Sequence, residues 1–224
     1  GKVKLFTGCT GALLDNDTLQ ASRRLLRRLG YRVSIPDGQV CCGALHQHGG
    51  KPAKARQLAD ANLAAFGGGQ EPILTFATGC AAHLLGYRTR CPQAEAFTDR
   101  VKDVLDFLAE DAHHLLRFAA MPASVALHIP CTQRNVLKQQ HSLINILSRV
   151  PDLRLVVVNP EGGCCGAAGS YMLTQAALSA RLGDAMVERV IDSGANLVLT
   201  TNIGCSLQLS AGLRRRGRDI TVMH

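Results

Sequence analysis

The sequence predicts an α/β protein built from two βαβ-type units with parallel sheets, related by a pseudo-twofold axis. Three observations support this fold class. Short apolar runs alternate with amphipathic stretches of helical length throughout the 224 residues. Cysteines follow the apolar runs instead of lying inside them. The pattern of the first half also recurs in the second half.

The internal repeat rests on three landmarks that occur in the same order in both halves. They are an apolar run ending in Cys-Thr, a Cys-Cys-Gly block, and an apolar run ending in Gly-Cys. The landmarks lie at residues 4–10, 33–44 and 73–80, and again at 126–132, 157–167 and 198–205. Their cysteines are offset by 122, 123 and 125 residues. Three landmarks at a nearly constant offset indicate a duplication.

The first half is expected to run strand, helix, strand, Cys-Cys-Gly loop, helix, strand, Gly-Cys turn and helix. Continuous short apolar runs are typical of parallel strands that are buried on both faces. Asp17 or Asn16 is expected to cap the first helix, which ends at Gly30. The strands are expected near residues 3–7, 31–35 and 72–77, and the helices near 17–29, 51–66 and 79–87.

The second half repeats this order. Its clearest helix is an amphipathic stretch from Leu173 to Ile191 that ends at Gly194. The segment between the halves is partly helical, matches neither repeat and ends at Pro122, which is typical of a connector. We therefore expect a first repeat at residues 1–90, a connector at 91–122 and a second repeat at 123–224.

Composition excludes several classes of protein. With 46% hydrophobic and 19% charged residues, the chain is neither disordered nor fibrous. No apolar run approaches the roughly 20 residues that a membrane-spanning helix needs. The chain begins at Gly1 and enters strand-like sequence at once, so we expect an excised domain or a processed piece. Walker A, Gly-x-Gly-x-x-Gly and nucleophile-elbow motifs are absent from the sequence.

Nine cysteines are the most informative feature of the composition. Secreted disulfide frameworks usually belong to small chains without a core, whereas this chain has ample aliphatic residues, so metal or cluster ligation in a reducing cytosol is favoured. Sites in open parallel sheets lie at the carboxyl ends of the strands. Each half is therefore expected to gather four thiols at one sheet edge. They are Cys9, Cys41, Cys42 and Cys80, and Cys131, Cys164, Cys165 and Cys205.

The double cysteines require a bend in the backbone. Neighbouring residues of a strand point to opposite faces, so Gly43 and Gly166 are expected to turn both thiols toward one site. Four thiolates suit an iron–sulfur cluster or zinc. Ligands scattered over about 70 residues favour a cluster, and zinc stays open at one site. Cys91 lies outside the repeat and is expected to be a small core residue.

The cysteine blocks carry a resemblance to a known family. The two Cys-Cys-Gly blocks, with Gly163–Tyr171 and Thr201–Leu209 most of all, resemble the cysteine-rich CCG-domain family. That family includes the cysteine-rich subunit of heterodisulfide reductase, the glycolate oxidase iron-sulfur subunit and lactate-utilisation relatives. The resemblance covers both halves and is greatest to the C-terminal CCG region of the glycolate oxidase iron-sulfur subunit.

The resemblance implies an iron-sulfur electron-transfer subunit or domain of an oxidoreductase that is inactive without its partners. A flavoprotein subunit would oxidise a 2-hydroxy acid such as glycolate or lactate, and electrons would pass toward a quinone. A ferredoxin-like iron-sulfur domain or subunit is a further implied partner. The implied location is cytoplasmic, peripheral on the inner membrane. One alternative is a heterodisulfide-reductase-like subunit, and another is a zinc-stabilised docking module without a redox role.

Departures from the family pattern narrow the choice of cofactor. Relatives of the heterodisulfide reductase type carry five thiolates around a noncubane cluster, and each repeat here is one thiol short. His83 and Gln208 stand three residues after Cys80 and Cys205. Four thiols imply a [4Fe–4S] cubane or a site with a non-cysteine ligand, for which His83 is a candidate. A family His-Asp-Pro-Cys block is His128-Ile129-Pro130-Cys131 here, so no carboxylate proton relay is carried over.

The remaining candidate functional residues are histidines and arginines. His46 and His48 follow Cys42 and could tune a cluster, relay protons or bind an anion, or could be exposed loop residues. The net charge is +8. Much of it lies in a basic ribbon that we define as Arg23, Arg24, Arg27 and Arg28. This ribbon is a solvated face or a docking surface. Nucleic-acid binding is not expected, because aromatic residues make up only 4%.

Overall fold

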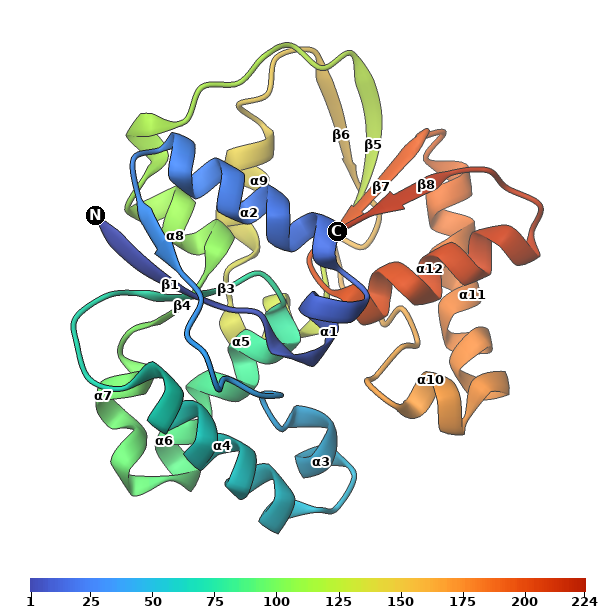
Figure 1. The fold of residues 1–224 in the computed structure, drawn as a ribbon. Helices are drawn as coiled ribbons and strands as arrows, with labels where there is room; N and C mark the ends of the chain where they lie inside the picture. The colour runs from blue at the N-terminus through green and yellow to red at the C-terminus, as the bar shows by residue number, and fades with distance from the viewer. The chain divides into compact units, whose positions relative to one another are not determined.

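A computed structural model describes all 224 residues, apart from the side chain of Ala12. The chain divides into two compact units, Gly1–Leu116 and Arg117–His224, and each is described by itself (Figure 1). Each unit contains a four-stranded sheet in which every pair of neighbouring strands is parallel. The predicted α/β class with parallel sheets is therefore confirmed.

The sheet of the first unit contains the three predicted strands and a fourth. Its strand order is β2-β1-β3-β4, so β1 and β3 lie at the centre. The strands are β1 (Lys2–Phe6), β2 (Arg32–Ser34), β3 (Ile73–Thr75) and β4 (Val101–Asp103).

Helices follow each strand of the first unit. The predicted helix after β1 begins at Asn16, and its N-cap is Asp15 instead of the expected Asn16 or Asp17. Asp17 instead lies in the first turn, where its carboxylate complements the helix dipole. The helices are α1 (Gly8–Leu13), α2 (Asn16–Arg28), α3 (Ala44–His48), α4 (Pro52–Phe66), α5 (Thr78–Leu85), α6 (Tyr87–Arg90), α7 (Glu95–Thr98) and α8 (Val104–Glu110), with 3₁₀ turns at Pro92–Ala94 and His113–Leu115.

The second unit repeats the topology of the first, with strand order β6-β5-β7-β8. The helix predicted from Leu173 is interrupted at Gln175, where the backbone leaves the helical region. The strands are β5 (Ala123–His128), β6 (Leu153–Val157), β7 (Leu197–Thr200) and β8 (Thr221–Met223). The helices are α9 (Gln140–Leu147), α10 (Tyr171–Thr174), α11 (Ala176–Asp192) and α12 (Ile203–Arg215), with a π-helical turn at Thr132–Leu137.

The expected connector differs from what the structure shows. Residues 91–116 belong to the first unit, and β4 within them pairs with β3. The reason is burial, because Val101, Phe107 and Leu108 pack into the unit. Cys91 is buried in the same core, as expected for a small apolar side chain.

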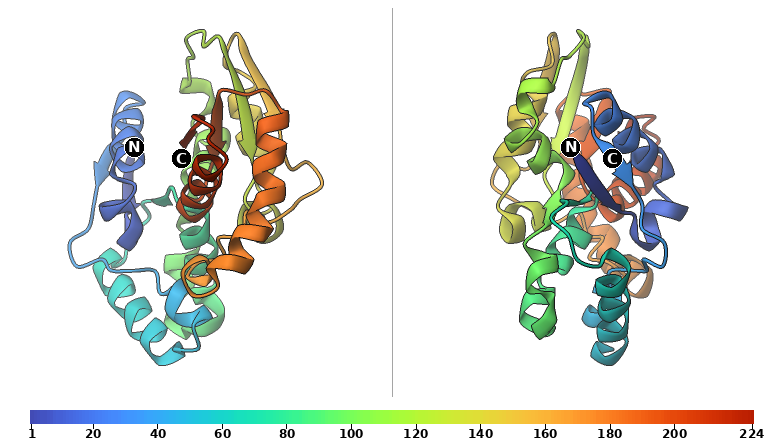
Figure 2. Two further views of the ribbon diagram at one scale, coloured as in Figure 1. Left: turned by 90° about the vertical axis from the view of Figure 1, so that its right-hand side faces the viewer. Right: turned by 60° about the vertical axis from the view of Figure 1, so that its left-hand side comes forward.

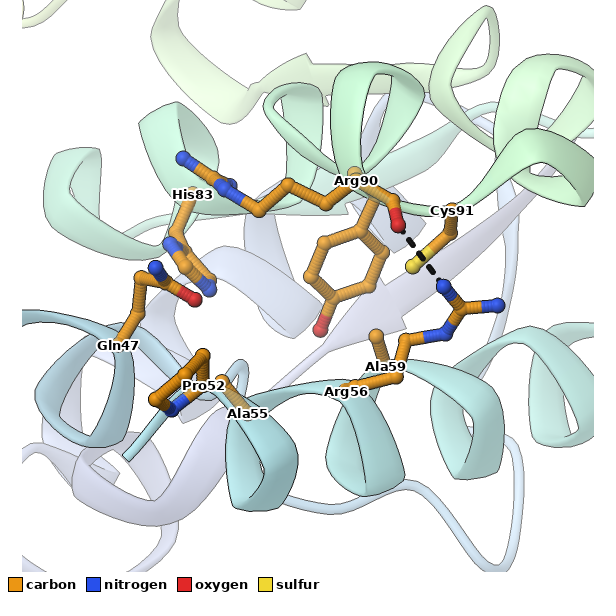
Figure 3. Close-up of a pocket in the computed structure, with 9 residues that line it drawn as sticks. Gln47, Pro52, Ala55, Arg56, Ala59, His83, Arg90 and Cys91 are labelled. Carbon is orange, nitrogen blue, oxygen red and sulfur yellow. Dashed lines mark hydrogen bonds between the residues drawn. The ribbon is translucent and has the colours of Figure 1, made fainter. Parts of the chain in front are cut away.

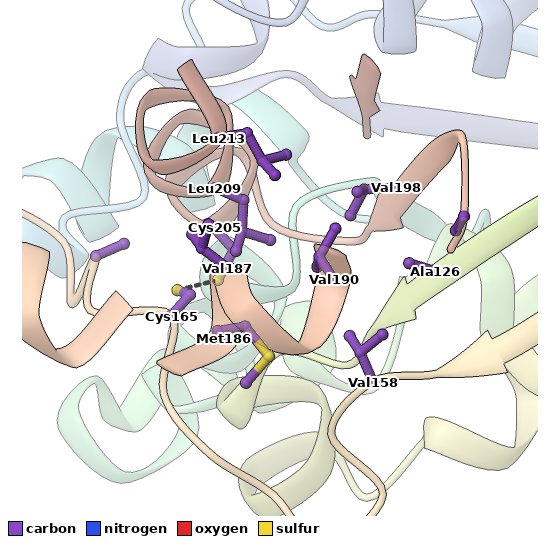
Figure 4. Packing of buried hydrophobic residues seen from close by; sticks show 12 residues of the cluster. Ala126, Val158, Cys165, Met186, Val187, Val190, Val198, Cys205, Leu209 and Leu213 are labelled. Carbon is purple, nitrogen blue, oxygen red and sulfur yellow. Dashed lines mark hydrogen bonds between the residues drawn. The ribbon is translucent and has the colours of Figure 1, made fainter. Parts of the chain in front are cut away.

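The cores of the two units differ in chemistry. The first core contains an aromatic group in which Phe66 and Tyr87 both lie against Phe97. The second core is aliphatic, and Val187 and Val190 of α11 pack with Leu209 and Leu213 of α12 (Figure 4). Figure 2 shows α11 and α12 side by side in further views. Close packing of these helices holds the start of α12 at the sheet edge.

We predict that Leu209→Ala lowers the free energy of unfolding by about 2–5 kcal/mol, because a fully buried side chain leaves a cavity. Leu207→Ala on the same helix is the control, since Leu207 is 41% exposed, and it should cost less than about 1 kcal/mol. Urea denaturation measures both. Equal losses would contradict the packing of α12 against α11.

Candidate metal centres

The first and last cysteines of each repeat lie where a central strand passes into a helix. Cys9 follows β1 and Cys131 follows β5. Cys80 and Cys205 lie in the first turns of α5 and α12, directly after β3 and β7. The backbone N–H groups and dipole of a helix start favour a thiolate or another anion there. Adjacent parallel strands therefore bring these thiols to one sheet edge, as the sequence predicted.

The double cysteines enter the same edge from loops that turn at glycine. Gly43 and Gly166 have φ of +92° and +86°, a conformation that disfavours any side chain. The Gly43 N–H donates to Cys41 Sγ at 3.4 Å, and the Gly166 N–H donates to Cys164 Sγ at 3.3 Å. The bend expected at these glycines is thus present in both units, and each bend also supplies a hydrogen bond to a sulfur.

In the first unit, the four predicted thiols form one cluster. The Cys9 thiol donates to Cys41 Sγ at 3.5 Å, and the Cys42 thiol interacts with Cys41 and Cys80. Hydrogen bonds from Cys42 and then Cys9 lower the pKa of Cys41, whereas donation to Cys41 and burial raise the pKa of Cys9 and Cys42. One thiol of this cluster is therefore the favoured site of negative charge.

The second unit repeats this arrangement. The Cys165 thiol donates to Cys205 Sγ at 2.7 Å (Figure 4). Hydrogen bonds from Cys131 and then Cys165 lower the pKa of Cys164, and the same contacts with burial raise the pKa of Cys131 and Cys165. Full ionisation of four neighbouring thiols requires a cation to offset their charge.

Buried polar side chains fix the backbone of the first double cysteine. Asn62, which is fully buried, accepts from the Val40 N–H at 2.9 Å and donates to the Cys41 carbonyl at 3.1 Å. The Tyr87 hydroxyl donates to the Cys42 carbonyl at 2.6 Å. Neither residue was predicted from the sequence, because both lie far along the chain, on α4 and α6, and carry no motif.

Different residues fix the second double cysteine. The Ser179 hydroxyl donates to the Gly166 carbonyl at 2.8 Å, and the Gln208 amide donates to the Ser179 carbonyl at 3.0 Å. Gln208 stands where the first unit has His83. In this unit that position therefore supports the loop through an amide and not an imidazole.

An amide side chain also braces the residue two positions before the first cysteine of each unit. Gln39 accepts from the Thr7 N–H at 2.8 Å, and Asn159 accepts from the Ile129 N–H at 2.9 Å. These two amides come from different positions of the repeat but make the same contact. They tie the loop that follows the second strand to the strand end that presents Cys9 or Cys131.

His83 lies beside the first double cysteine. Its Nε2 is 3.5 Å from the point where a β-carbon on Gly43 would lie. Burial lowers the pKa of His83 to about 4, so the ring is neutral at pH 7. The ring lines a pocket of about 310 Å³ together with Gln47 and Arg90 (Figure 3). In the same pocket, Arg56 is held by the Arg90 carbonyl and Asp60.

The other candidate histidines lie on the short helix α3. His48 is exposed, with its ring centroid 6.1 Å from that of His83. His46 is half-buried and contributes to the lowered pKa of Cys41, although hydrogen bonds are the larger cause. His48 therefore lies near His83, and His46 is close enough to Cys41 to favour its charged form.

His128 lies at the second cluster, and no role was predicted for it from the sequence. It is the last residue of β5 and is fully buried. A ring nitrogen of His128 and the sulfurs of Cys165 and Cys205 lie within 4.8 Å of one another. Burial lowers the pKa of His128 to about 4. The second cluster thus has an imidazole on its buried side.

Two parallel sheets, each with four thiols at its carboxyl edge, define a duplicated cysteine-rich protein. Comparison with protein families agrees, because the profile described as "Cysteine-rich domain" (CCG) matches residues 3–85 and 125–210. The chain belongs to this CCG family. One matched segment lies in each of the two units.

Relatives with descriptive names cover nearly the whole chain. It is 31% identical to the "Probable glycolate oxidase iron-sulfur subunit" of Bacillus subtilis over 96% of this chain and 51% of that protein. It is 30% identical to the "Glycolate oxidase iron-sulfur subunit" of Escherichia coli over 95% and 54%. It is 26% identical to "Lactate utilization protein A" of Bacillus pumilus over 100% and 96%. The chain therefore spans about half the length of the glycolate oxidase subunits.

A solved structure shares the fold. A hypothetical protein from Helicobacter pylori matches 99% of this chain and 47% of its own, with a TM-score of 0.60 at 10% identity. In the described part of the chain, no helix has both the length and the hydropathy required of a membrane span.

We predict that Gly166→Ala destabilises the protein more than Gly162→Ala does. A β-carbon at Gly166 would lie 2.2 Å from the Ser179 carbonyl oxygen, whereas Gly162 also has positive φ but faces open space. The steric difference should add about 1–3 kcal/mol to the cost in unfolding free energy, as measured by urea denaturation. Equal costs for the two variants would show that the contact of the loop with α11 is unimportant.

Proposed function

We propose that this chain is an iron-sulfur electron-transfer subunit or domain of an oxidoreductase that oxidises a 2-hydroxy acid such as glycolate or lactate. The observation that carries the proposal is the convergence of four thiols at each sheet edge. The names of the glycolate oxidase and lactate-utilisation relatives support the reaction class. When bound, an iron–sulfur cluster accepts and releases single electrons.

The residues of each edge fit such a cluster. Two thiols come from strand-to-helix junctions and two from a glycine turn, so they approach from different directions. We assign Cys9, Cys41, Cys42 and Cys80 to the first centre and Cys131, Cys164, Cys165 and Cys205 to the second. Four thiols match the four irons of a [4Fe–4S] cubane, one ligand for each iron.

Zinc is the alternative to a cluster at one of the two centres. Tetrahedral zinc with Zn–S bonds of about 2.3 Å needs sulfurs about 3.8 Å apart. Among the described residues, the group of three His, Cys, Asp or Glu ligand atoms found within 4.8 Å of one another lies in the second unit. That compact group makes the second centre the better candidate for zinc.

Partners follow from the reaction class. Hydride removal from a 2-hydroxy acid is flavin chemistry, so a flavoprotein subunit would deliver the electrons. A ferredoxin-like iron-sulfur domain or subunit would lie between that flavin and this chain, and a quinone would receive the electrons. We place the assembly in the cytoplasm, peripheral to the inner membrane.

The basic ribbon is our candidate docking surface for the flavoprotein. Arg24, Arg27 and Arg28 are exposed on α2, and Arg23 is half-buried. Opposite charges accelerate the encounter of electron-transfer partners in a salt-dependent way. The ribbon belongs to the helix that follows α1 and Cys9, so docking there would bring a partner to the first unit.

We predict that anaerobically purified protein is brown and that dithionite bleaches it. Replacing Cys164 and Cys165 together by Ser should remove about half of the bound iron, because the thiols of the first unit are untouched. Replacing Cys91 by Ser is the control and should leave the iron content unchanged. Iron analysis with visible spectroscopy measures both. Loss of all iron from a folded double variant would contradict two separate centres.

We also predict that reversing two charges of the ribbon, Arg24→Glu with Arg28→Glu, slows electron delivery from the flavoprotein. The rate should fall by roughly tenfold or more at low salt and depend less on ionic strength. Arg181→Glu with Arg214→Glu, two exposed residues of the second unit, makes the same charge change as a control. Stopped-flow reduction at several salt concentrations measures the rates. An unchanged rate would assign the ribbon to a solvated face.

A further inference from the structure

The buried imidazole of His128 has one ring nitrogen without a partner. Its Nδ1 lies 2.9 Å from Thr200 Oγ1, on the neighbouring strand β7. Its Nε2 is buried and makes no hydrogen bond within the described part of the chain. A buried polar atom without a partner is costly, and native structures contain few of them. The position therefore calls for a ligand.

The surroundings of His128 indicate what that ligand is. Its ring nitrogen, Cys165 Sγ and Cys205 Sγ lie within 4.8 Å of one another, and all three residues are buried. The other two thiols of this centre, Cys131 and Cys164, are exposed. The second centre thus has an inner side of one imidazole and two thiols and an outer side of two thiols. Nitrogen and sulfur donors in this arrangement suit iron or zinc.

Thr200 holds the ring as a metal ligand requires. A metal-bound histidine normally donates its other ring N–H to an oxygen, which fixes the tautomer and the orientation of the ring. Thr200 Oγ1 can accept from Nδ1–H, and this tautomer leaves the Nε2 lone pair available. In a purely structural role, a buried ring nitrogen normally has a hydrogen-bond partner.

The first unit lacks this feature. The residue that corresponds to His128 in the repeat is Phe6, whose ring packs against Phe66 at 6.0 Å. A phenyl ring offers no donor atom. The histidine of the first unit, His83, is replaced in the second by Gln208. At each of these two positions, one unit has a histidine and the other unit does not. Replacing each histidine by the residue of the other unit is therefore a natural test.

We propose that His128 is a metal ligand of the second centre through Nε2, where its imidazole takes the place of one of the two exposed thiols, whereas the first centre has Phe6 at this position and thiols as its only ligands. The inference rests on the proposed function, since it takes the second centre to hold iron. A neutral imidazole in place of negative charge raises a reduction potential. The second centre should therefore be reduced before the first.

The test uses the full chain loaded with iron and sulfide under anaerobic conditions, with ¹⁵N only in histidine. In the Cys41→Ser, Cys42→Ser variant, the second centre is observed without the first. Pulsed EPR of the reduced protein should then show the coupling of a directly bound ¹⁵N. His128→Phe should abolish that coupling and lower the potential of the second centre. His83→Gln is the matched control and should change neither.

Two results would overturn the proposal. The first is a loaded second centre without bound-nitrogen coupling, and the second is coupling that survives His128→Phe. If His128→Phe does not fold, as shown by circular dichroism, the coupling in the parent protein still decides. Failure of the wild-type chain to bind iron at all would sink the proposed function, and this inference with it.

Discussion

Four neighbouring thiols cannot all ionise without a cation, and this electrostatic constraint governs the architecture of each sheet edge. The fold places partial positive charge near the sulfurs, which offsets part of the repulsion between thiolates. Cys80 and Cys205 lie at helix starts, and the glycine N–H groups donate to Cys41 and Cys164. These groups favour negative charge on sulfur but are too weak to hold several thiolates together. A bound metal or cluster would supply the remaining charge, so its binding would be coupled to ionisation of the thiols.

Duplication produced two sheet edges that share one arrangement of cysteines but have different supporting residues. The first double cysteine is held by Asn62 and Tyr87, and the second by Ser179 with Gln208. The ligand-bearing backbone is the shared part, because it depends on strand order and on a glycine that no side chain can replace without strain. The supporting contacts are free to vary, since any buried donor in reach of the loop carbonyls suffices. The two sheet edges therefore surround their thiols with different side chains.

Most of the fold could be predicted from the sequence, because each short apolar run and each cysteine block occurs twice, once in each half. Three strands in each half and the convergence of the thiols follow from apolar runs, parallel pairing and cysteine position. The edge strands β4 and β8 were not predicted, because neither leads into one of the cysteine landmarks of the repeat. Asn62 and Tyr87 were missed since only the tertiary fold brings them to the loop. His128 was visible in the sequence, but its free nitrogen shows only in the structure.

The central claim is that both sheet edges hold iron–sulfur clusters. The most direct test measures iron, zinc and acid-labile sulfide on the same anaerobically reconstituted full chain, together with its Mössbauer spectrum. We expect iron and sulfide in comparable amounts, with spectra of iron in sulfur-rich, tetrahedral sites and two distinguishable components. Tightly bound zinc with no acid-labile sulfide at either edge would contradict the claim.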